Sequence, residues 1–132
     1  MYRVADLMTR TLVTLRESDD LTLADDILAL GRFRHLPVVG ERGQLVGLIT
    51  HRDLLRLFAE RVGRDRRTIL AREVMQKPPV TAEPDMPAFE AARWMYENKY
   101  GCLPVVEKGR LVGIVTEADF LQLAAHAFRP QL

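Results

Sequence analysis

The sequence is poor in the residues that indicate redox, metal or membrane chemistry. Among 132 residues there is one cysteine, Cys102, so no disulfide can form within the chain. The three histidines, His35, His51 and His126, lack the spacing of a zinc site. No apolar run approaches the roughly 20 residues that span a bilayer, and the N-terminus lacks the pattern of a secretion signal. We therefore expect no metal, no membrane partner and a cytoplasmic location.

An excess of charge of one sign is also missing. The chain has 19 Lys and Arg against 18 Asp and Glu, a formal net charge of +1. This net charge predicts no overall electrostatic attraction to nucleic acid. The basic residues of its one arginine-rich run are Arg61, Arg64, Arg66 and Arg67. Because no aromatic residues interleave with them, we interpret this run as a solvated linker rather than a nucleic-acid contact. No phosphate-binding glycine loop, nucleophile elbow or Ser/His/Asp set is present, which predicts that the chain is not an enzyme.

What the chain does contain is an internal repeat. Identical residues recur in the same order in both halves: Met8 and Met75, Val-Thr at 13–14 and 80–81, Leu-Pro-Val-Val at 36–39 and 103–106, and Leu-Val-Gly at 45–47 and 111–113. A unit of roughly 60 residues buries only part of its apolar surface alone, so we expect the two copies to pack around a shared core. We place the first copy at 1–62, a linker at 63–70 and the second copy at 71–128.

Each copy has the pattern of a β-α-β-β-α unit. In the first copy, the five elements are expected at 12–15, 21–31, 36–39, 45–50 and 53–61. In the second copy, Asp85 is expected to cap the first helix. The predicted fold class is therefore α/β (α+β), with two β-α-β-β-α repeats packed as a pseudo-two-fold pair.

The order of these motifs resembles a known family. Leu-Pro-Val-Val, a glycine-bearing turn, and Leu-Val-Gly followed by two aliphatic residues and Thr-x-x-Asp occur twice, as in a tandem pair of CBS domains, often called a Bateman module. The segments at 4–8 and 71–75 also resemble the lead-in that starts each unit of that family. The resemblance covers nearly the whole chain and implies a stand-alone, non-catalytic regulatory module that requires no cofactor.

The resemblance also implies the partners. The expected ligand is adenine-containing, namely AMP, ADP, ATP or S-adenosylmethionine, bound in clefts between the paired copies. The other expected partners are a second copy of the chain, in a homodimer formed through exposed apolar helix faces, and an effector protein. The alternative function is a ligand-free oligomerisation or interaction module.

Thr50 and Asp53, and likewise Thr116 and Asp119, stand where a strand is predicted to end and a helix to begin. Free backbone N–H groups at such a point favour a phosphate. In the family, the carboxylate at this position accepts the ribose hydroxyls and the threonine bonds sugar or phosphate. The same pattern also fits a capping box, in which the two side chains only close the start of the helix. Both roles can hold at once.

The resemblance further implies that each cleft combines the Thr-x-x-Asp of one copy with the first strand of the other, where the backbone recognises adenine. The two expected sets are Thr50, Asp53, Val80 and Thr81, and Thr116, Asp119, Val13 and Thr14.

The copies differ just before the Leu-Pro-Val-Val strand. Arg34 and His35 stand there in the first copy, and Gly101 and Cys102 in the second. The resemblance implies that residues at these positions reach phosphates, so we expect two unlike clefts, with at most one well furnished for phosphate. The alternative is that Arg34 and His35 only end a helix, where its dipole favours basic side chains.

Gly47 and Gly113 interrupt otherwise β-branched strands. Such a glycine marks a β-bulge or a group that packs closely on the backbone. The sequence leaves open whether the bulge is the only reason or a ligand faces the glycine.

Overall fold

The computed structural model describes residues 1–22, 34–60, 63, 65–77 and 80–130. The chain forms two compact units. One unit, named the α3 unit after its longest described helix, consists of Val13–Pro79, and the other, the α6 unit, consists of Met1–Leu12 and Val80–Leu132. No helix within the described ranges is long and apolar enough to cross a membrane.

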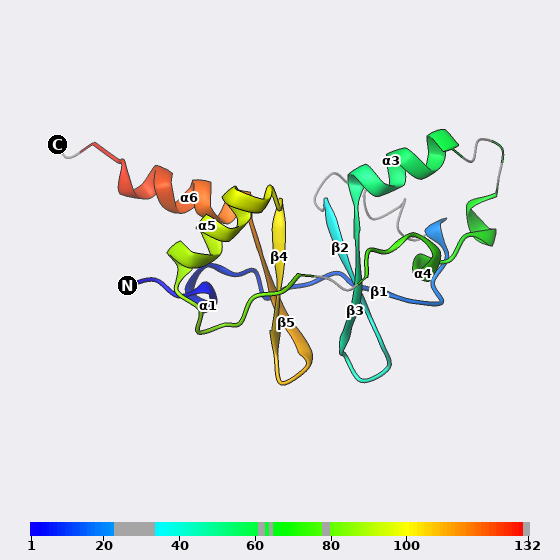
Figure 1. The fold of residues 1–132 in the computed structure, drawn as a ribbon, viewed down its shortest axis with the longest axis horizontal. Coiled ribbons are helices and arrows are strands. Elements are labelled where there is room, and N and C mark those ends of the chain that lie inside the picture. Colours follow the sequence, from blue (N-terminus) through cyan, green and yellow to red (C-terminus); the bar gives the residue numbers. More distant parts are fainter. Residues whose placement is uncertain (23–33, 61–62, 64, 78–79, 131–132) are drawn as a thin grey trace. The chain divides into compact units, whose positions relative to one another are not determined.

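The α3 unit is built on a three-stranded sheet (Figure 1). Strand β2 (His35–Val39) lies in the centre, parallel to β1 (Leu15–Arg16) and antiparallel to β3 (Leu45–Thr50). The predicted strands at 36–39 and 45–50 are therefore confirmed. Pro37 lies within the central strand, where β1 pairs only with the two residues that follow it, so its missing N–H breaks no pairing with β1.

Helices cover this sheet and close the core. Helix α3 (His51–Glu60) follows β3 directly and buries Leu54 and Leu57. The short 3₁₀ helix η1 (Arg66–Thr68) and helix α4 (Ala71–Val74) come next. The buried core of the unit consists of Leu15, Leu21, Leu36, Val38, Ile49, Leu54, Leu57, Ile69, Ala71 and Met75.

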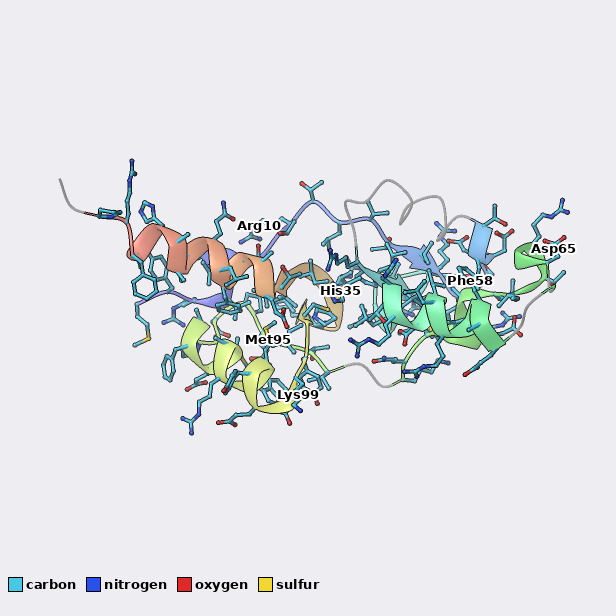
Figure 2. The ribbon with its side chains drawn as sticks, turned by 90° about the horizontal axis from the view of Figure 1, so that it is seen from above. Arg10, His35, Phe58, Asp65, Met95 and Lys99 are labelled. Carbon is cyan, nitrogen blue, oxygen red and sulfur yellow. The ribbon has the colours of Figure 1, made fainter. Side chains whose placement is uncertain are left out.

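The α6 unit is built on the second hairpin. Strands β4 (Cys102–Glu107) and β5 (Arg110–Thr116) pair antiparallel, with helix α5 (Ala88–Asn98) before them and helix α6 (Glu117–Ala127) after them. The short helix α1 (Val4–Leu7) completes the unit. Its buried core consists of Val4, Met8, Ala82, Ala91, Met95, Leu103, Val105 and Val115. Met95, on α5, is labelled in Figure 2.

Each lead-in segment belongs to the unit that holds the other copy's hairpin. The N–H of Val4 donates to the carbonyl of Met86 at 2.8 Å, and Thr9 forms a bridge with Ile114. In the α3 unit, Gln76 forms the equivalent bridge with Leu48. The compact units thus follow different limits from the sequence copies placed at 1–62 and 71–128.

The first strand of each copy is shorter than the sequence predicts. The expected strand at 12–15 is reduced to β1, which begins at Leu15. In the second copy, the matching segment makes a single parallel bridge, in which the N–H of Ala82 donates to Pro104 and its carbonyl accepts from Val106, each at 2.9 Å. The helix predicted at 21–31 lies, beyond its first two residues, outside the described residues.

The prediction that Asp85 caps the first helix of the second copy is wrong. Helix α5 starts after Pro87, which occupies the N-cap position and has no side-chain hydrogen-bonding group. The N–H of Ala88 instead donates to the carbonyl of Tyr2 at 2.8 Å. Backbone of the lead-in therefore takes the place of a side-chain cap.

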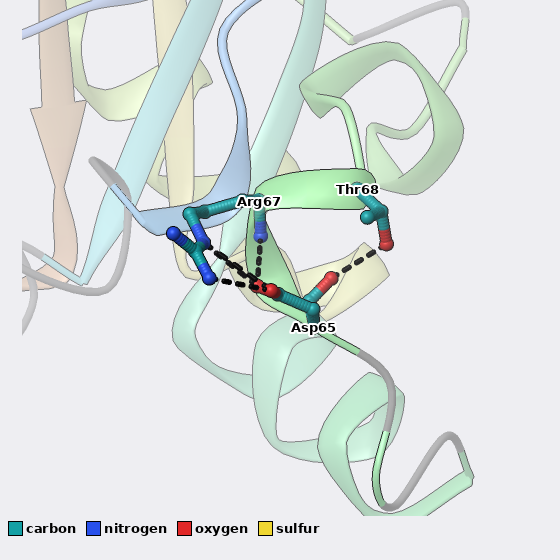
Figure 3. A network of polar contacts seen from close by, with 3 residues as sticks. All are labelled: Asp65, Arg67 and Thr68. Carbon is teal, nitrogen blue, oxygen red and sulfur yellow. Dashed lines mark hydrogen bonds and ion pairs between the residues drawn. The ribbon is translucent and has the colours of Figure 1, made fainter.

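The described part of the arginine-rich run is an exposed turn (Figure 3). Nη2 of Arg67 lies 2.9 Å from Oδ2 of Asp65, and Oγ1 of Thr68 donates to the carbonyl of Asp65 at 2.6 Å. The hydrogen bond from Arg67 lowers the pKa of Asp65. Arg67 is thus exposed and paired with a neighbouring acid, while Arg61 and Arg64 lie outside the described residues, and the linker interpretation stays a prediction.

Candidate functional site

Both Thr-x-x-Asp patterns lie where a strand meets a helix. Thr50 is the last residue of β3, and Asp53 lies in the first turn of α3; we call this the first junction. Thr116 is the last residue of β5, and Asp119 lies in the first turn of α6; this is the second junction. All four residues are partly buried. The structure places these pairs where the sequence predicts them, and their contact with a ligand stays a prediction.

Each pair makes hydrogen bonds that close the start of its helix. The N–H of Thr50 donates to Oδ2 of Asp53 at 2.9 Å, and the N–H of Asp53 donates to Oγ1 of Thr50 at 3.1 Å. At the second junction, the N–H and the hydroxyl of Thr116 donate to Oδ2 of Asp119 at 2.8 and 3.3 Å. The capping role that the sequence left open is therefore present at both junctions. Because these bonds use one oxygen of each carboxylate, the other oxygen can still accept from a ligand hydroxyl.

The remaining carboxylate oxygens have different surroundings. Oδ1 of Asp53 lies 3.4 Å from Nε2 of Gln76, near the outer limit of a hydrogen bond. Gln76 follows α4, and its own N–H donates to the carbonyl of Leu48 at 2.9 Å. Oδ1 of Asp119 has no hydrogen bond among the described residues. Oδ1 of Asp119 is therefore available to a ligand, whereas Oδ1 of Asp53 has a long contact with the Gln76 amide.

Arg34 and His35 lie beside the first junction. His35 stands opposite Thr50 in the pairing of β2 with β3, and the carbonyl of Arg34 accepts the N–H of His51 at 2.9 Å. The Arg34 side chain is exposed, and His35, labelled in Figure 2, is half-buried. The structure thus brings both predicted residues next to Thr50. The helix that the alternative interpretation requires before Arg34 lies outside the described residues.

Cys102 stands at the second junction, opposite Thr116. Burial raises the pKa of its thiol to about 12. The thiol is therefore protonated at neutral pH and is a poor nucleophile and a poor metal ligand. Among the described residues, no group of three or more His, Cys, Asp or Glu side chains is placed to hold a metal ion.

The predicted first-strand residues are partly buried. Val13 packs against the core of the α3 unit, and Val80 packs against the core of the α6 unit. Val13 and Thr14 thus share a unit with the first junction, and Val80 and Thr81 share one with the second. The predicted sets join residues of different units and stay predictions.

Two methionines fill the space next to the strand glycines. Three side-chain atoms of Met75 would lie within 3.0 Å of a Cβ added to Gly47. A Cβ on Gly113 would lie 2.6 Å from Sδ of Met8. The strand register also shifts beside each glycine, so the predicted bulges are present. Sequence reasoning missed the methionines, although Met8 and Met75 recur with the repeat in the same way as the two glycines.

Each unit has one surface hollow that lies away from its junction. One of about 450 Å³, in the α6 unit, is lined by Glu83, Pro84, Asp85, Val106, Glu107 and Lys108. One of about 490 Å³, in the α3 unit, is lined by Arg16, Glu17, Ser18, Val39, Gly40, Glu41, Arg42, Gln44 and Arg72. Both lie near the hairpin turns, whereas the junctions lie at the opposite ends of β3 and β5.

The chain thus contains two β-hairpins, and each is followed by a helix whose start is capped by a Thr-x-x-Asp pair. This arrangement defines a module of repeated α+β units. Comparison with protein-family models identifies these repeats. The chain belongs to the CBS domain family, with one CBS domain at residues 4–60 and a second at 71–126. The resemblance noted in the sequence is therefore confirmed, as is the fold of a tandem CBS pair.

Relatives of the chain differ widely in length. A CBS domain-containing protein of Dictyostelium discoideum is 37% identical over 137 residues, which cover 96% of this chain and 94% of that protein. Homoserine O-acetyltransferase of Methanococcoides burtonii is 37% identical over 121 residues, which cover 91% of this chain and 24% of the enzyme. The chain thus spans about a quarter of that curated relative, so the matching segment is one part of a larger enzyme.

Solved structures of related proteins contain adenosyl compounds. The structure of CBSX2 in complex with AMP has a TM-score of 0.83 and 27% identity, and it covers 98% of this chain and 100% of that one. A CBS domain pair in complex with 5′-methylthioadenosine and S-adenosyl-L-methionine has a TM-score of 0.83 and 30% identity, and it covers 96% of this chain and 98% of that one. CBS pairs similar to this chain therefore bind adenosyl ligands.

Proposed function

We propose that the chain is a non-catalytic regulatory module that binds an adenine-containing ligand, such as AMP, ADP, ATP or S-adenosylmethionine, at its Thr-x-x-Asp junctions. The observation that carries the proposal is the hydrogen bonding of Asp119. Its Oδ2 accepts the capping bonds of Thr116, while its Oδ1 has no partner among the described residues. A carboxylate fixed in this way presents an oriented acceptor to the hydroxyls of a ribose. The AMP and S-adenosylmethionine complexes of similar CBS pairs support the choice of ligand.

Each group at a junction has a distinct proposed role. The carboxylates of Asp53 and Asp119 accept ribose hydroxyls, and the threonine hydroxyls bond sugar or phosphate. At the first junction, Arg34 and His35 reach the phosphates. The predicted adenine contacts are backbone groups of Val13, Thr14, Val80 and Thr81. No step in this scheme breaks a covalent bond, so the output is a change in state rather than a product.

Regulation follows from linkage between binding and conformation. A ligand that binds one state in preference stabilises that state, by about 2.7 kcal/mol at a hundred times its dissociation constant. We propose that an effector protein reads the liganded state and that the module acts in the cytoplasm, where it samples free adenosyl compounds. The effector protein can respond only if its affinity for the module differs between the ligand-bound and ligand-free states.

We propose in addition that the chain forms a homodimer through apolar helix faces. Helix α6 has no buried residue, and its Leu121 is 69% exposed, while Leu55 on α3 is 56% exposed. The same faces support the alternative function, a ligand-free interaction module. Light scattering distinguishes a dimer from a monomer, and Leu121→Lys should shift a dimer toward the monomer by placing a charge in its interface.

Calorimetric titration with AMP, ATP, 5′-methylthioadenosine and S-adenosylmethionine tests the ligand proposal. We expect at least one compound to bind the wild type, and we expect Asp53→Ala and Asp119→Ala each to remove the binding at its own junction. If no compound gives heat or raises the melting temperature, the interaction module is the better account.

A matched control separates capping from ligand binding. Asp6 accepts the N–H of Arg3 at 2.8 Å at the start of α1 and thus makes the same kind of capping bond away from both junctions. Asp6→Ala should lower stability by up to about 1 kcal/mol, as loss of a cap does, without changing ligand affinity. Equal loss of affinity in Asp6→Ala and Asp119→Ala would contradict a direct role for Asp119.

A further inference from the structure

The two junctions have matching backbones. At the first, the N–H of His51 donates to the carbonyl of Arg34 at 2.9 Å, and at the second, the N–H of Glu117 donates to the carbonyl of Gly101 at 3.2 Å. His51 therefore corresponds to Glu117, and Arg34 corresponds to Gly101. Differences in ligand preference between the junctions must come from side chains.

The first junction is rich in basic side chains. Arg34, His51 and Arg52 are all exposed, and none of them has an ion pair within the described part of the chain. His35, labelled in Figure 2, follows Arg34 in the chain and pairs with Thr50 across β2 and β3. Guanidinium and imidazole groups close to free backbone N–H groups favour phosphate oxygens, since they add charge-assisted hydrogen bonds to those of the backbone.

The second junction has no basic side chain at the positions equivalent to Arg34, His35, His51 and Arg52. Those positions hold Gly101, Cys102, Glu117 and Ala118, so the one charged side chain among them is a carboxylate. A phosphate placed there would meet a carboxylate where the first junction offers a basic side chain. An uncharged thioether nucleoside would meet no such repulsion, and a sulfonium nucleoside would be attracted.

The ribose acceptors do not account for this difference, since both junctions have them. Asp53 and Asp119 occupy the same position and make the same capping contact through Oδ2. The junctions differ instead in the side-chain charges near the phosphate or other group that the ligand carries on its ribose. The side-chain charges therefore determine which class of adenosyl compound each junction prefers, and they do not affect recognition of the adenosine itself.

We propose that the two junctions take different chemical classes of adenosyl ligand. The first junction takes a phosphorylated, anionic adenosine compound, and the second takes an adenosyl compound without phosphate, either uncharged or sulfonium. This inference rests on the proposed function, because it assigns ligand classes to the sites proposed there. Its consequence is that one chain responds to two adenosyl pools, one anionic and one not.

Charge transplants between the junctions test this assignment. The variant His51→Glu/Arg52→Ala gives the first junction the helix-start residues of the second, and Glu117→His/Ala118→Arg does the reverse. All four positions are exposed, so neither change disturbs a core. The control is Arg42→Gln, which removes a charge at the hairpin turn of the same unit. Binding of ATP and of 5′-methylthioadenosine is measured by calorimetry at two salt concentrations, and folding is measured by thermal melting.

The first variant should lose about tenfold or more in ATP affinity, the scale expected when one guanidinium near a phosphate is removed and a carboxylate is added. Its affinity for 5′-methylthioadenosine should stay within about twofold of the wild type, and ATP binding should lose much of its salt dependence. The reverse variant should bind one more ATP per chain. Arg42→Gln should change neither affinity.

The outcomes separate this inference from the proposed function. If the wild type binds neither ATP nor 5′-methylthioadenosine, both fail. If adenosyl compounds bind but the first variant keeps its ATP affinity, or loses both affinities equally at an unchanged melting temperature, the inference alone is wrong. If that variant melts lower, Arg34→Gln repeats the test with a residue outside every described helix, and unchanged ATP affinity there also contradicts the inference.

Discussion

The thioether of Met75 lies directly against the backbone of Gly47, in the space that a side chain at position 47 would occupy. Met8 and Gly113 make the same contact in the α6 unit. In each unit, the lead-in segment is therefore anchored by a methionine that needs a glycine opposite it. Because methionine is flexible and polarizable, it fits the irregular surface beside the bulge.

The first prediction concerns this contact. Gly47→Ala should destabilise the protein by about 1–3 kcal/mol, because its Cβ overlaps the Met75 side chain in a packed core. Met75→Ala alone should cost about 2–5 kcal/mol through the cavity that it leaves. The double variant should be more stable than the sum of the two losses implies, since the new methyl group at position 47 enters the space that the Met75 side chain leaves. Urea unfolding of the four proteins measures the coupling, and strict additivity would show that the two residues do not share this space.

The second prediction concerns Gln76, which lies 3.4 Å from the acceptor oxygen of Asp53. Gln76→Ala should change stability by less than about 0.5 kcal/mol, because so long a contact contributes little. It should tighten binding at the first junction up to about threefold, since a ribose hydroxyl no longer competes with the amide for Oδ1. Gln122→Ala, an exposed change on α6, is the control. A marked loss of affinity in Gln76→Ala would instead make Gln76 a ligand contact.

The third prediction concerns pH. Burial raises the pKa of Cys102 to about 12 in the folded state, from an ordinary value of 9.0. The folded state therefore binds this proton more tightly, and the difference costs no stability below pH 9. Between pH 9 and about 12, the unfolded state loses the proton first, so the free energy of unfolding should fall by about 1.4 kcal/mol per pH unit from this group.

Comparison with Cys102→Ala isolates that contribution from those of lysines and tyrosines. The variant should be less stable at pH 7, because it removes a buried side chain, but its stability should fall less steeply above pH 9. Alkylation of the native wild type at pH 8 should also be slow and should become rapid in denaturant. Equal alkaline slopes in the two proteins would contradict a buried, protonated thiol.

Local signals in the sequence were sufficient for the hairpins and the junctions. The short apolar runs around Pro37 and Pro104 predicted the strands, and Thr-x-x-Asp predicted the points where helices begin. These features depend on residues close in the chain. The cap at Asp85 was predicted wrongly because the group that meets the helix start is the carbonyl of Tyr2, which is remote in sequence.

The exchange of lead-in segments could not be predicted for a related reason. Met8 and Met75 each follow an acidic and an aliphatic residue, and Gly47 and Gly113 stand in nearly the same strand sequence. The repeat therefore makes each methionine compatible with either glycine. Which pairing forms depends on the path of the whole chain, and no local pattern contains that information.

The most direct test of the account is an NMR titration of the isotope-labelled wild type with AMP and with 5′-methylthioadenosine, followed through the backbone amides. The account predicts saturable shifts at Thr50, Asp53, Thr116 and Asp119 and at the helix starts beside them, with little change near the hairpin turns that line the surface hollows. Shifts confined to the hollows around Arg42 or Lys108, or no shifts with either compound, would contradict the claim that the Thr-x-x-Asp junctions hold the ligand.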